Sequence, residues 1–270
     1  MSQKYYKVYS SILRLAFLIF GVLILQFIVT AQSSPELKKY KSFASGEQLV
    51  YQIRYGFIHG GEASASIVLE KYEGKTVYHA RVIAQSKGVA DKLFSVRDIY
   101  ESYFDPSTCL PKKAIRNIKE GNYRYYNEVF YKHEDSTLYS QRSDSVFKVP
   151  PAILDMVSTL YYVRSVDMNK LEKGSAIEVI TFFGDEIFPF KIRYSGKEVV
   201  KSKFGKVECY RFDPVVEPGR IFKSEDDMTI WISDDKNLLP VLIRFDMLIG
   251  SVRCELESYS NLKYDFKTDN

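Results

Sequence analysis

Three histidines, His59, His79 and His133, are the side chains best suited to bind a metal or to transfer protons. The surrounding pattern places them in a turn, on the polar face of a strand and in a polar loop, without the i, i+4 spacing that pairs metal ligands on a helix. The chain also contains no G-x-S-x-G elbow, no P-loop and no Rossmann fingerprint. We therefore predict no catalytic residue, no metal site and no cofactor, and we interpret the histidines as surface residues.

Carboxylates are the remaining candidates for chemistry. Asp98 and Glu101 are three residues apart, and on a strand that spacing puts them on opposite faces unless a bulge intervenes. Two acidic stretches, Glu225-Asp226-Asp227 and Asp234-Asp235, bracket a predicted strand that contains Trp231. Oxygen-rich loops can bind calcium, but no Asp-x-Asp-x-Asp-Gly loop is present, so solvated turn residues are favoured here.

Aromatic side chains offer a third kind of site, because tyrosine presents an apolar ring with a polar tip. The stretch GNYRYYNEVFY at 121–131 fits a stacking platform, although a central strand covered on both faces would look the same and is favoured. The residues that we predict to contact a ligand are Tyr51, Ile53, Tyr55, Tyr78, Val157, Leu160, Tyr161 and Trp231.

One helix is predicted among these strands, at about 151–165 in the stretch PPAILDMVSTLYYVRS. Prolines are tolerated in a first helical turn, and the apolar residues of this stretch recur with helical spacing as one stripe that must cover a sheet. Its two charges, Asp155 and Arg164, are nine apart. They are either held against the sheet by polar partners, or Asp155 is a simple helix N-terminal charge.

The rest of the chain alternates polar and apolar residues, as β-strands do. Leu49, Tyr51, Ile53 and Tyr55 define one face of the first strand, and Gly60-Gly61 is the predicted hairpin turn that follows it. Tyr (21) and Phe (18) are abundant and suit half-buried strands. The class is therefore mainly β.

The chain contains a possible internal duplication. The pattern D-x4-L-P-x9-G-x2-R occurs at 105–124 and again at 234–253. Gly46 and Gly56 are ten apart, as are Gly174 and Gly184. Regular hairpin spacing is the alternative explanation, but it rarely holds register over such a length. We predict one domain at 46–260, with related antiparallel halves at 46–124 and 174–253 that form a curved sheet or open barrel against which the helix packs.

Residues 1–31 resemble a cleavable export signal, with Lys4, Lys7 and Arg14, an apolar run and a small-residue exit before Gln32. The alternative is an uncleaved inner-membrane anchor at 12–29, through which the chain would contact the membrane. Without the leader the chain carries 35 basic and 34 acidic residues, from totals of 38 and 34. This balance argues against a nucleic-acid partner. Residues 32–45 are expected to be a solvated polar lead-in, and 261–270 a frayed polar tail.

Three cysteines, Cys109, Cys209 and Cys254, allow one disulfide in an oxidising compartment. Cys254 lies on the apolar face of its predicted strand and is interpreted as a small buried residue. No obligatory disulfide is predicted.

Four motifs together resemble the exported bacterial family known as domain of unknown function 3108. They are F-x2-G-E-x-L-x-Y-x3-Y-G at 43–56, D-x2-E-S-Y at 98–103, DMVSTLYYVR at 155–164 and WISDD…LPV at 231–241. The resemblance implies an envelope location and a β-rich fold, and it brings no activity or catalytic residues with it. An analogy to the half-open barrels that carry lipoproteins across the periplasm rests on architecture alone.

These observations predict a non-catalytic protein exported to the periplasm or associated with the outer membrane. Its concave sheet would bind an apolar or amphipathic ligand, such as a lipid, or an envelope protein partner. The alternatives are a structural component of an envelope assembly, or a carboxylate-dependent glycan or peptide hydrolase that uses Asp98 or Glu101.

Overall fold

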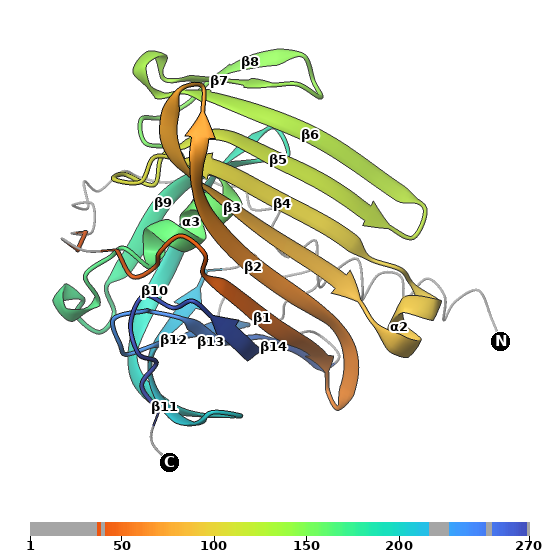
Figure 1. Ribbon diagram of the computed structural model, residues 1–270, viewed down its shortest axis with the longest axis vertical. Helices are drawn as coiled ribbons and strands as arrows, with labels where there is room; N and C mark the ends of the chain where they lie inside the picture. The colour runs from red at the N-terminus through yellow and green to blue at the C-terminus, as the bar shows by residue number, and fades with distance from the viewer. Residues whose placement is uncertain (1–36, 39–40, 216–226, 247–249, 269–270) are drawn as a thin grey trace.

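The computed structural model describes residues 37–38, 41–215, 227–246 and 250–268, and most of them belong to one antiparallel sheet of 14 strands (Figure 1). The predicted leader at 1–31 lies outside the described residues. Along the sheet the strand order is β8-β7-β6-β5-β4-β3-β2-β1-β14-β13-β12-β11-β10-β9. The elements are β1 (Gln48–Tyr55), β2 (Ile58–Tyr72), β3 (Lys75–Ser86), α2 (Gly88–Leu93), β4 (Arg97–Phe104), β5 (Pro111–Glu120), β6 (Tyr123–Lys132), η1 (His133–Asp135), β7 (Thr137–Ser140), β8 (Ser145–Lys148), α3 (Met156–Val163), η2 (Met168–Lys170), β9 (Ala176–Phe183), β10 (Glu186–Ser202), β11 (Gly205–Pro214), β12 (Met228–Ser233), β13 (Pro240–Asp246) and β14 (Ser251–Ser260).

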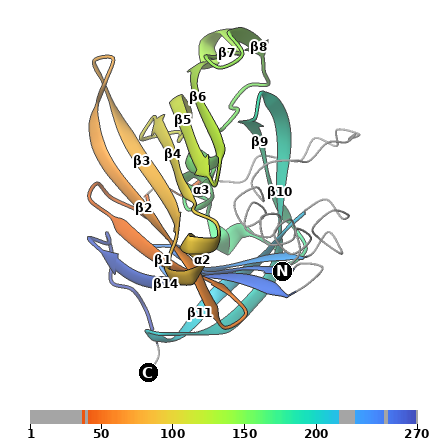
Figure 2. The same ribbon diagram turned by 90° about the vertical axis from the view of Figure 1, so that its right-hand side faces the viewer.

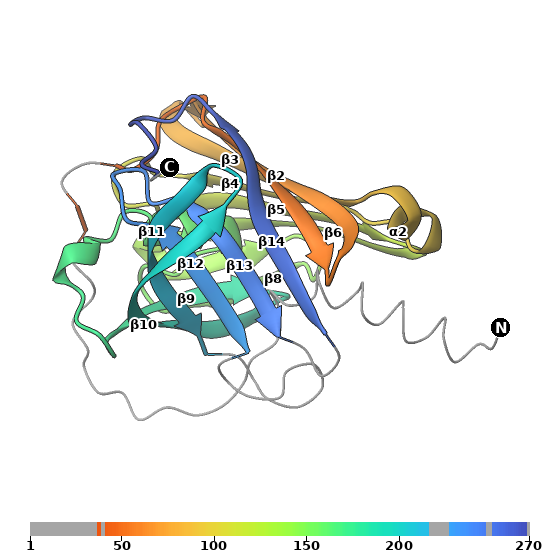
Figure 3. The ribbon, with the colours of Figure 1, turned by 90° about the horizontal axis from the view of Figure 1, so that it is seen from below.

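The sheet curls so that the strands at its two ends face each other, as Figures 2 and 3 show. We call the line along which β9 faces β6–β8 the seam. Leu154 bridges it in part, because its N–H donates to the Ile180 carbonyl while its own carbonyl accepts from the Phe182 N–H, both at 2.9 Å. The predicted mainly β open barrel is thereby confirmed.

The helix α3 packs on the concave face of the sheet against β3, β4 and β9. It starts at Met156, later than the predicted 151, because Asp155 caps it. The Asp155 carboxylate accepts from the Val157 and Ser158 N–H groups at 2.7 and 3.0 Å. The two prolines therefore precede the helix instead of forming its first turn.

The apolar stripe of α3 fills the concave face as predicted. Val157 and Tyr161 are buried in a cluster with Phe43, Tyr78 and Phe104. The Tyr161 ring meets the Phe43 ring edge-on, with centroids 4.8 Å apart. Such aromatic pairs contribute about 0.5–1.5 kcal/mol beyond the area they bury.

The first hairpin differs from the sequence expectation. Its turn lies at Gly56 and Phe57, and Gly60 and Gly61 lie inside β2. Gly61 is needed there because a Cβ at this position would come within 2.4 Å of the Gln85 carbonyl oxygen on β3. The glycine pair therefore does not form a turn, and Gly61 marks a close backbone approach between β2 and β3.

The two halves of the chain share an arrangement of strands. β1–β6 and β9–β14 are consecutive antiparallel meanders, joined edge to edge where β1 pairs with β14 (Figure 1). The β4–β5 and β12–β13 pairings each shift register directly after a Leu-Pro, where Lys112 in one half and Val241 in the other have no paired residue on the neighbouring strand. The two halves therefore share a bulge at the repeated Leu-Pro, and the duplication itself stays a prediction. In the second half, β10 is one long strand that is bent by a bulge before Gly196.

Two segments expected to be solvated are packed. Phe43 in the lead-in has 0% of its surface exposed, and the Lys38 N–H donates to the Ser165 carbonyl at 2.8 Å. In the tail, Phe266 packs edge-on against Phe204 and Tyr259. All three cysteines are free thiols, with Cys109 and Cys209 buried and Cys254 partly exposed. Within the described ranges, no helix has the length and apolar character of a membrane span.

Candidate functional site

A cleft of about 50 Å³ opens on the concave side of the seam, between β4–β6, the end of β9 and the start of α3. Its walls are mostly aromatic and apolar, with a few polar side chains among them. The residues that define it here are Tyr100, Arg116, Tyr125, Asn127, Val129, Tyr131, Asp155, Val157, Phe182 and Phe183. We refer to this space as the cleft.

Arg116 is the cationic side chain of the cleft. It lies on the inner face of β5, opposite Tyr100 of β4 and Asn127 of β6. Its guanidinium carbon is 3.9 Å from the centre of the Phe183 ring and 4.7 Å from that of Tyr125. Among the residues that the structure describes, no carboxylate lies within 4 Å of the guanidinium. Its charge is therefore stabilised by ring faces, and its N–H groups remain able to bind an anion.

Two other polar groups that line the cleft are deeply buried. The Tyr131 side chain is 8% exposed, and its hydroxyl has no hydrogen-bond partner within the described part of the chain. Asp155 accepts from the Ser102 hydroxyl at 2.5 Å in addition to its helix-capping bonds, and burial raises the pKa of its carboxyl. Because an unpartnered buried hydroxyl is costly, the Tyr131 hydroxyl favours a polar occupant of the cleft.

A polar chain closes the outer end of the seam beside the cleft. Asn127 donates to the Ser140 hydroxyl at 2.9 Å, and Ser140 donates to the Asp185 carboxylate at 2.6 Å. Asp185 belongs to the β9–β10 turn, so this chain connects β6 and β7 to the opposite edge of the sheet. It holds β6 and the end of β9, which carry Tyr125 and Phe183, on either side of Arg116.

The two carboxylates of the hydrolase hypothesis do not meet. Asp98 is fully buried on the inner face of β4, where it accepts from the Lys119 N–H at 3.1 Å. Burial raises the pKa of its carboxyl, and its neighbour is Glu120. Glu101 faces the other side of β4 and contacts His79 at 2.7 Å. Asp98 does not line the cleft, and Glu101 borders it but directs its carboxylate to His79, so the geometry gives the hydrolase hypothesis no pair of groups that face one substrate.

The predicted ligand-contacting residues do not form one surface. Tyr78, Val157, Leu160 and Tyr161 lie together in the cluster that packs α3 onto the sheet, and of these Val157 also borders the cleft. The others lie in three separate clusters: Tyr51 with Leu239 and Leu256, Ile53 and Tyr55 with Phe245, and Trp231 with Cys209 and Leu242. Most of these side chains therefore pack the interior.

The remaining candidate groups have structural partners. His59 and His133 contact backbone carbonyls of Gly61 and Pro111 at 2.9 and 2.8 Å. Asp235 accepts from the N–H groups of Asn237 and Leu238 in the β12–β13 turn. Glu225 and Asp226 lie outside the described residues. Within the described ranges, no group of three His, Cys, Asp or Glu side chains is placed to hold a metal.

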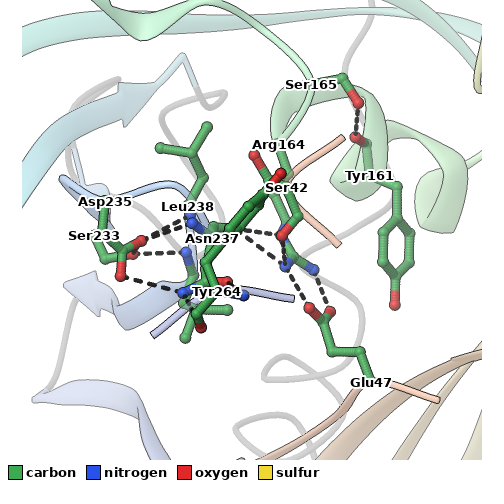
Figure 4. A network of polar contacts seen from close by, with 11 residues as sticks. Ser42, Glu47, Tyr161, Arg164, Ser165, Ser233, Asp235, Asn237, Leu238 and Tyr264 are labelled. Atoms are coloured by element: carbon green, nitrogen blue, oxygen red, sulfur yellow. Dashed lines mark hydrogen bonds and ion pairs between the residues drawn. The ribbon is translucent and has the colours of Figure 1, made fainter. Parts of the chain in front are cut away.

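Arg164 at the end of α3 is held by a buried polar network, drawn in Figure 4. It forms a bidentate ion pair with Glu47, with N···O distances of 2.6 and 2.8 Å, and the two side chains are 0% and 1% exposed. It also donates to the Asn237 carbonyl at 3.1 Å. The amide of Asn237 in turn donates to the Tyr264 carbonyl at 3.0 Å. The network fixes α3, and with it the cleft wall, to both halves of the sheet.

Sequence reasoning missed Arg116, Asn127, Tyr131 and Phe183 as site residues. The signal for two of them is the alternation of Tyr125, Asn127, Val129 and Tyr131 along the tyrosine-rich strand, which forms the inner face of β6. That strand was predicted to be covered on both sides. The prediction is wrong, because Tyr126 on the other side of β6 is about half exposed.

Comparison with known proteins supports the family and the fold. The sequence profile described as "Protein of unknown function (DUF3108)" matches residues 50–257. No curated protein matches the chain significantly. A β-barrel-like protein of domain of unknown function DUF1849 from Brucella abortus has a similar structure, with a TM-score of 0.52 and 11% identity over 83% of this chain and 99% of that chain. A DUF1089 family protein from Pseudomonas aeruginosa gives a TM-score of 0.37 and 8% identity over 66% of this chain and 87% of that chain.

Proposed function

The chain belongs to the DUF3108 family of proteins of unknown function, and from that premise and the cleft we propose that it is a non-catalytic binding protein of the bacterial envelope. Its ligand is an amphipathic molecule whose anionic head group, a carboxylate or a phosphate, binds Arg116. The observation that carries the proposal is the Arg116 guanidinium, which is packed between Tyr125 and Phe183 in an open cleft without a carboxylate partner among the described residues.

The chemistry of the cleft supports an anionic head group. Arginine presents several N–H donors in a plane that matches carboxylate and phosphate oxygens, and these bonds strengthen where aromatic walls lower the local dielectric. The Tyr131 hydroxyl supplies a further polar group in the wall of the cleft. A neutral apolar ligand would leave both groups without partners, which costs binding free energy.

The size of the cleft limits what it encloses. Pockets that hold a drug-sized ligand have volumes of roughly 300–1,000 Å³, against about 50 Å³ here. The cleft therefore takes the head group, and the apolar part of the ligand extends out of it. The buried tyrosines that we predicted as ligand contacts pack the interior instead of lining the cleft.

The envelope location rests on the sequence. The first 31 residues have the basic start, apolar run and small-residue exit of an export signal. The free cysteines suit an exported chain that needs no disulfide, because its core is large enough to be stable without one.

Titration with a fluorescent fatty acid, 11-(dansylamino)undecanoic acid, tests the proposal. Arg116→Gln is expected to weaken its binding about ten- to hundredfold, because a hydrogen bond to a charged group contributes about 1.5–3 kcal/mol. The matched control is Arg81→Gln, which removes an arginine on the outer face near Glu101 and should leave binding unchanged. Equal binding by the wild type and Arg116→Gln would refute the assignment of the cleft.

Native mass spectrometry of the protein purified from its own envelope provides an independent test. We expect a bound anionic amphiphile that is lost in Arg116→Gln. A preparation free of small molecules that instead retains one dominant protein neighbour after crosslinking would favour the structural assembly role.

A further inference from the structure

Exposed apolar side chains gather at one end of the sheet, along the connections of the first half. Phe57 in the β1–β2 turn is 92% exposed and Val89 on α2 is 70% exposed. Ile58, Leu93 and Tyr123 beside them are also exposed. Single exposed apolar residues are ordinary, but several at one end of a molecule mark a contact surface. We call this end, formed by the β1–β2 turn, α2 and the β5–β6 turn, the rim (Figure 1).

The rim is a connected surface and not three independent loops. The Lys87 N–H donates to the Gly60 carbonyl at 3.1 Å, which joins the start of α2 to β2. The Gly121 N–H donates to the Ser95 carbonyl at 2.8 Å, which joins the β5–β6 turn to the segment after α2. Gly121 also lies against the ring of Phe94, where a Cβ would come within 2.7 Å. The exposed side chains are therefore held in fixed positions relative to one another.

Positive charge surrounds these apolar residues. The basic side chains of the rim are Arg54, Lys87, Lys92, Arg97, Lys119 and Arg124. Its exposed acids are used within the rim, since Asp91 pairs with Arg97 at 2.8 Å and Glu62 lies 3.9 Å from Lys87. Lys92, Lys119 and Arg124 form no ion pair with any residue that the structure describes. The rim thus presents net positive charge beside bare apolar groups.

We propose that the rim docks on an anionic lipid surface, with Phe57 and the apolar residues of α2 inserted among the head groups. The combination of inserted apolar side chains and flanking lysines is that of interfacial membrane binding. A protein interface is less consistent with it, because lysine is depleted from such interfaces and their cores are flat and densely packed. The rim instead offers side chains at the tips of turns.

The full-length chain is tested with single cysteines at Phe57→Cys and Val89→Cys, labelled with the fluorophore NBD. Both cysteines are placed in a Cys254→Ser background, because Cys254 is partly exposed, whereas Cys109 and Cys209 are fully buried. Val146→Cys and Val199→Cys, at exposed positions away from the rim, are the matched controls. They also report any binding through the N-terminal segment alone.

Vesicles of equal parts phosphatidylglycerol and phosphatidylcholine are expected to shift the emission of both rim labels to the blue and to leave both control labels unchanged. Vesicles of phosphatidylcholine alone should give a weaker response. No shift at the rim, or equal shifts at rim and control positions, would overturn the proposal, as would a rim label that responds only to an envelope protein extract freed of lipid.

The contribution of the rim lysines to membrane binding is measured separately. Lys92→Gln and Lys119→Gln are each expected to lower the partition coefficient onto the anionic vesicles about fivefold. Lys148→Gln and Lys201→Gln change exposed lysines on β8 and β10 and should have little effect. Equal losses from both pairs would show that attraction is nonspecific and would contradict docking by the rim. The vesicle measurement is independent of fatty-acid binding in the cleft, because none of these four lysines lines the cleft.

Discussion

At the scale of single residues, Arg164 and Glu47 show how much a buried ion pair depends on both partners. Replacing Arg164 by Met leaves the Glu47 carboxylate buried without its partner, so we expect a loss of about 3–5 kcal/mol in the free energy of unfolding, measured by denaturant titration. Lys203→Met removes one partner of an exposed pair, Lys203–Glu257 at 2.6 Å, and should cost about 0–1 kcal/mol. Similar losses in the two variants would contradict the buried role of Arg164.

Asp98 makes a prediction of the opposite kind, because its charge is unfavourable in the folded state. Burial raises the pKa of its carboxyl above that of the unfolded chain, so the folded protein binds the proton more tightly. Stability then falls as pH rises from the unfolded pKa of about 4 through the raised folded value. Asp98→Asn keeps an oxygen for the Lys119 N–H and should be more stable than the wild type at neutral pH, with a flatter dependence on pH in this range.

The control for Asp98 is Asp105, a carboxylate whose pKa is lowered in the folded protein. Asp105 is partly desolvated, but hydrogen bonds from Ser107 and Thr108 outweigh that burial and lower the pKa of its carboxyl. Its contribution to stability is present above the unfolded pKa and is lost as pH falls through the lowered folded value. Asp105→Asn should therefore destabilise the protein at neutral pH. Thermal unfolding across the acid range distinguishes the stabilisation expected for Asp98→Asn from the destabilisation expected for Asp105→Asn. If both substitutions changed the stability in the same direction, the two predictions would be refuted.

At the scale of elements, local patterns in the sequence predict a segment well where one face is buried and fail where a distant contact decides. The alternation of Leu49, Tyr51 and Ile53 predicts β1 because their common face lies on the core. The start of α3 is missed because the Asp155 carboxylate, and not proline, provides the cap. Phe43 and Phe266 are missed because single aromatics in polar segments carry no period, and their partners lie far away in the chain.

The same limit explains why the cleft was not predicted. β5 carries apolar residues on both faces, with Ile115 on one and Ile118 on the other, so nothing in its pattern assigns Arg116 to the inside. Phe183 reaches Arg116 only because the sheet curls until β9 faces β5 and β6. The class of fold follows from local alternation, whereas the site follows from closure of the sheet. A charged residue on a strand with two apolar faces is the signal worth examining in such chains.

At the scale of the whole molecule, the two halves are coupled strongly enough to unfold together. β1 pairs with β14 along its whole length, α3 packs between the halves, and Arg164 is bound to Glu47 of one half and Asn237 of the other. The single tryptophan, Trp231, reports only on the second half, whereas far-ultraviolet circular dichroism reports on every strand. We expect both signals to follow one transition in denaturant. Two steps in circular dichroism, only one of them accompanied by tryptophan fluorescence, would mean that the two meanders are separate folding units. Arg164→Met loses one of these three connections. The two signals should separate in this variant if the coupling depends on the Arg164 network, because only the β1–β14 ladder and the packing of α3 then hold the halves together.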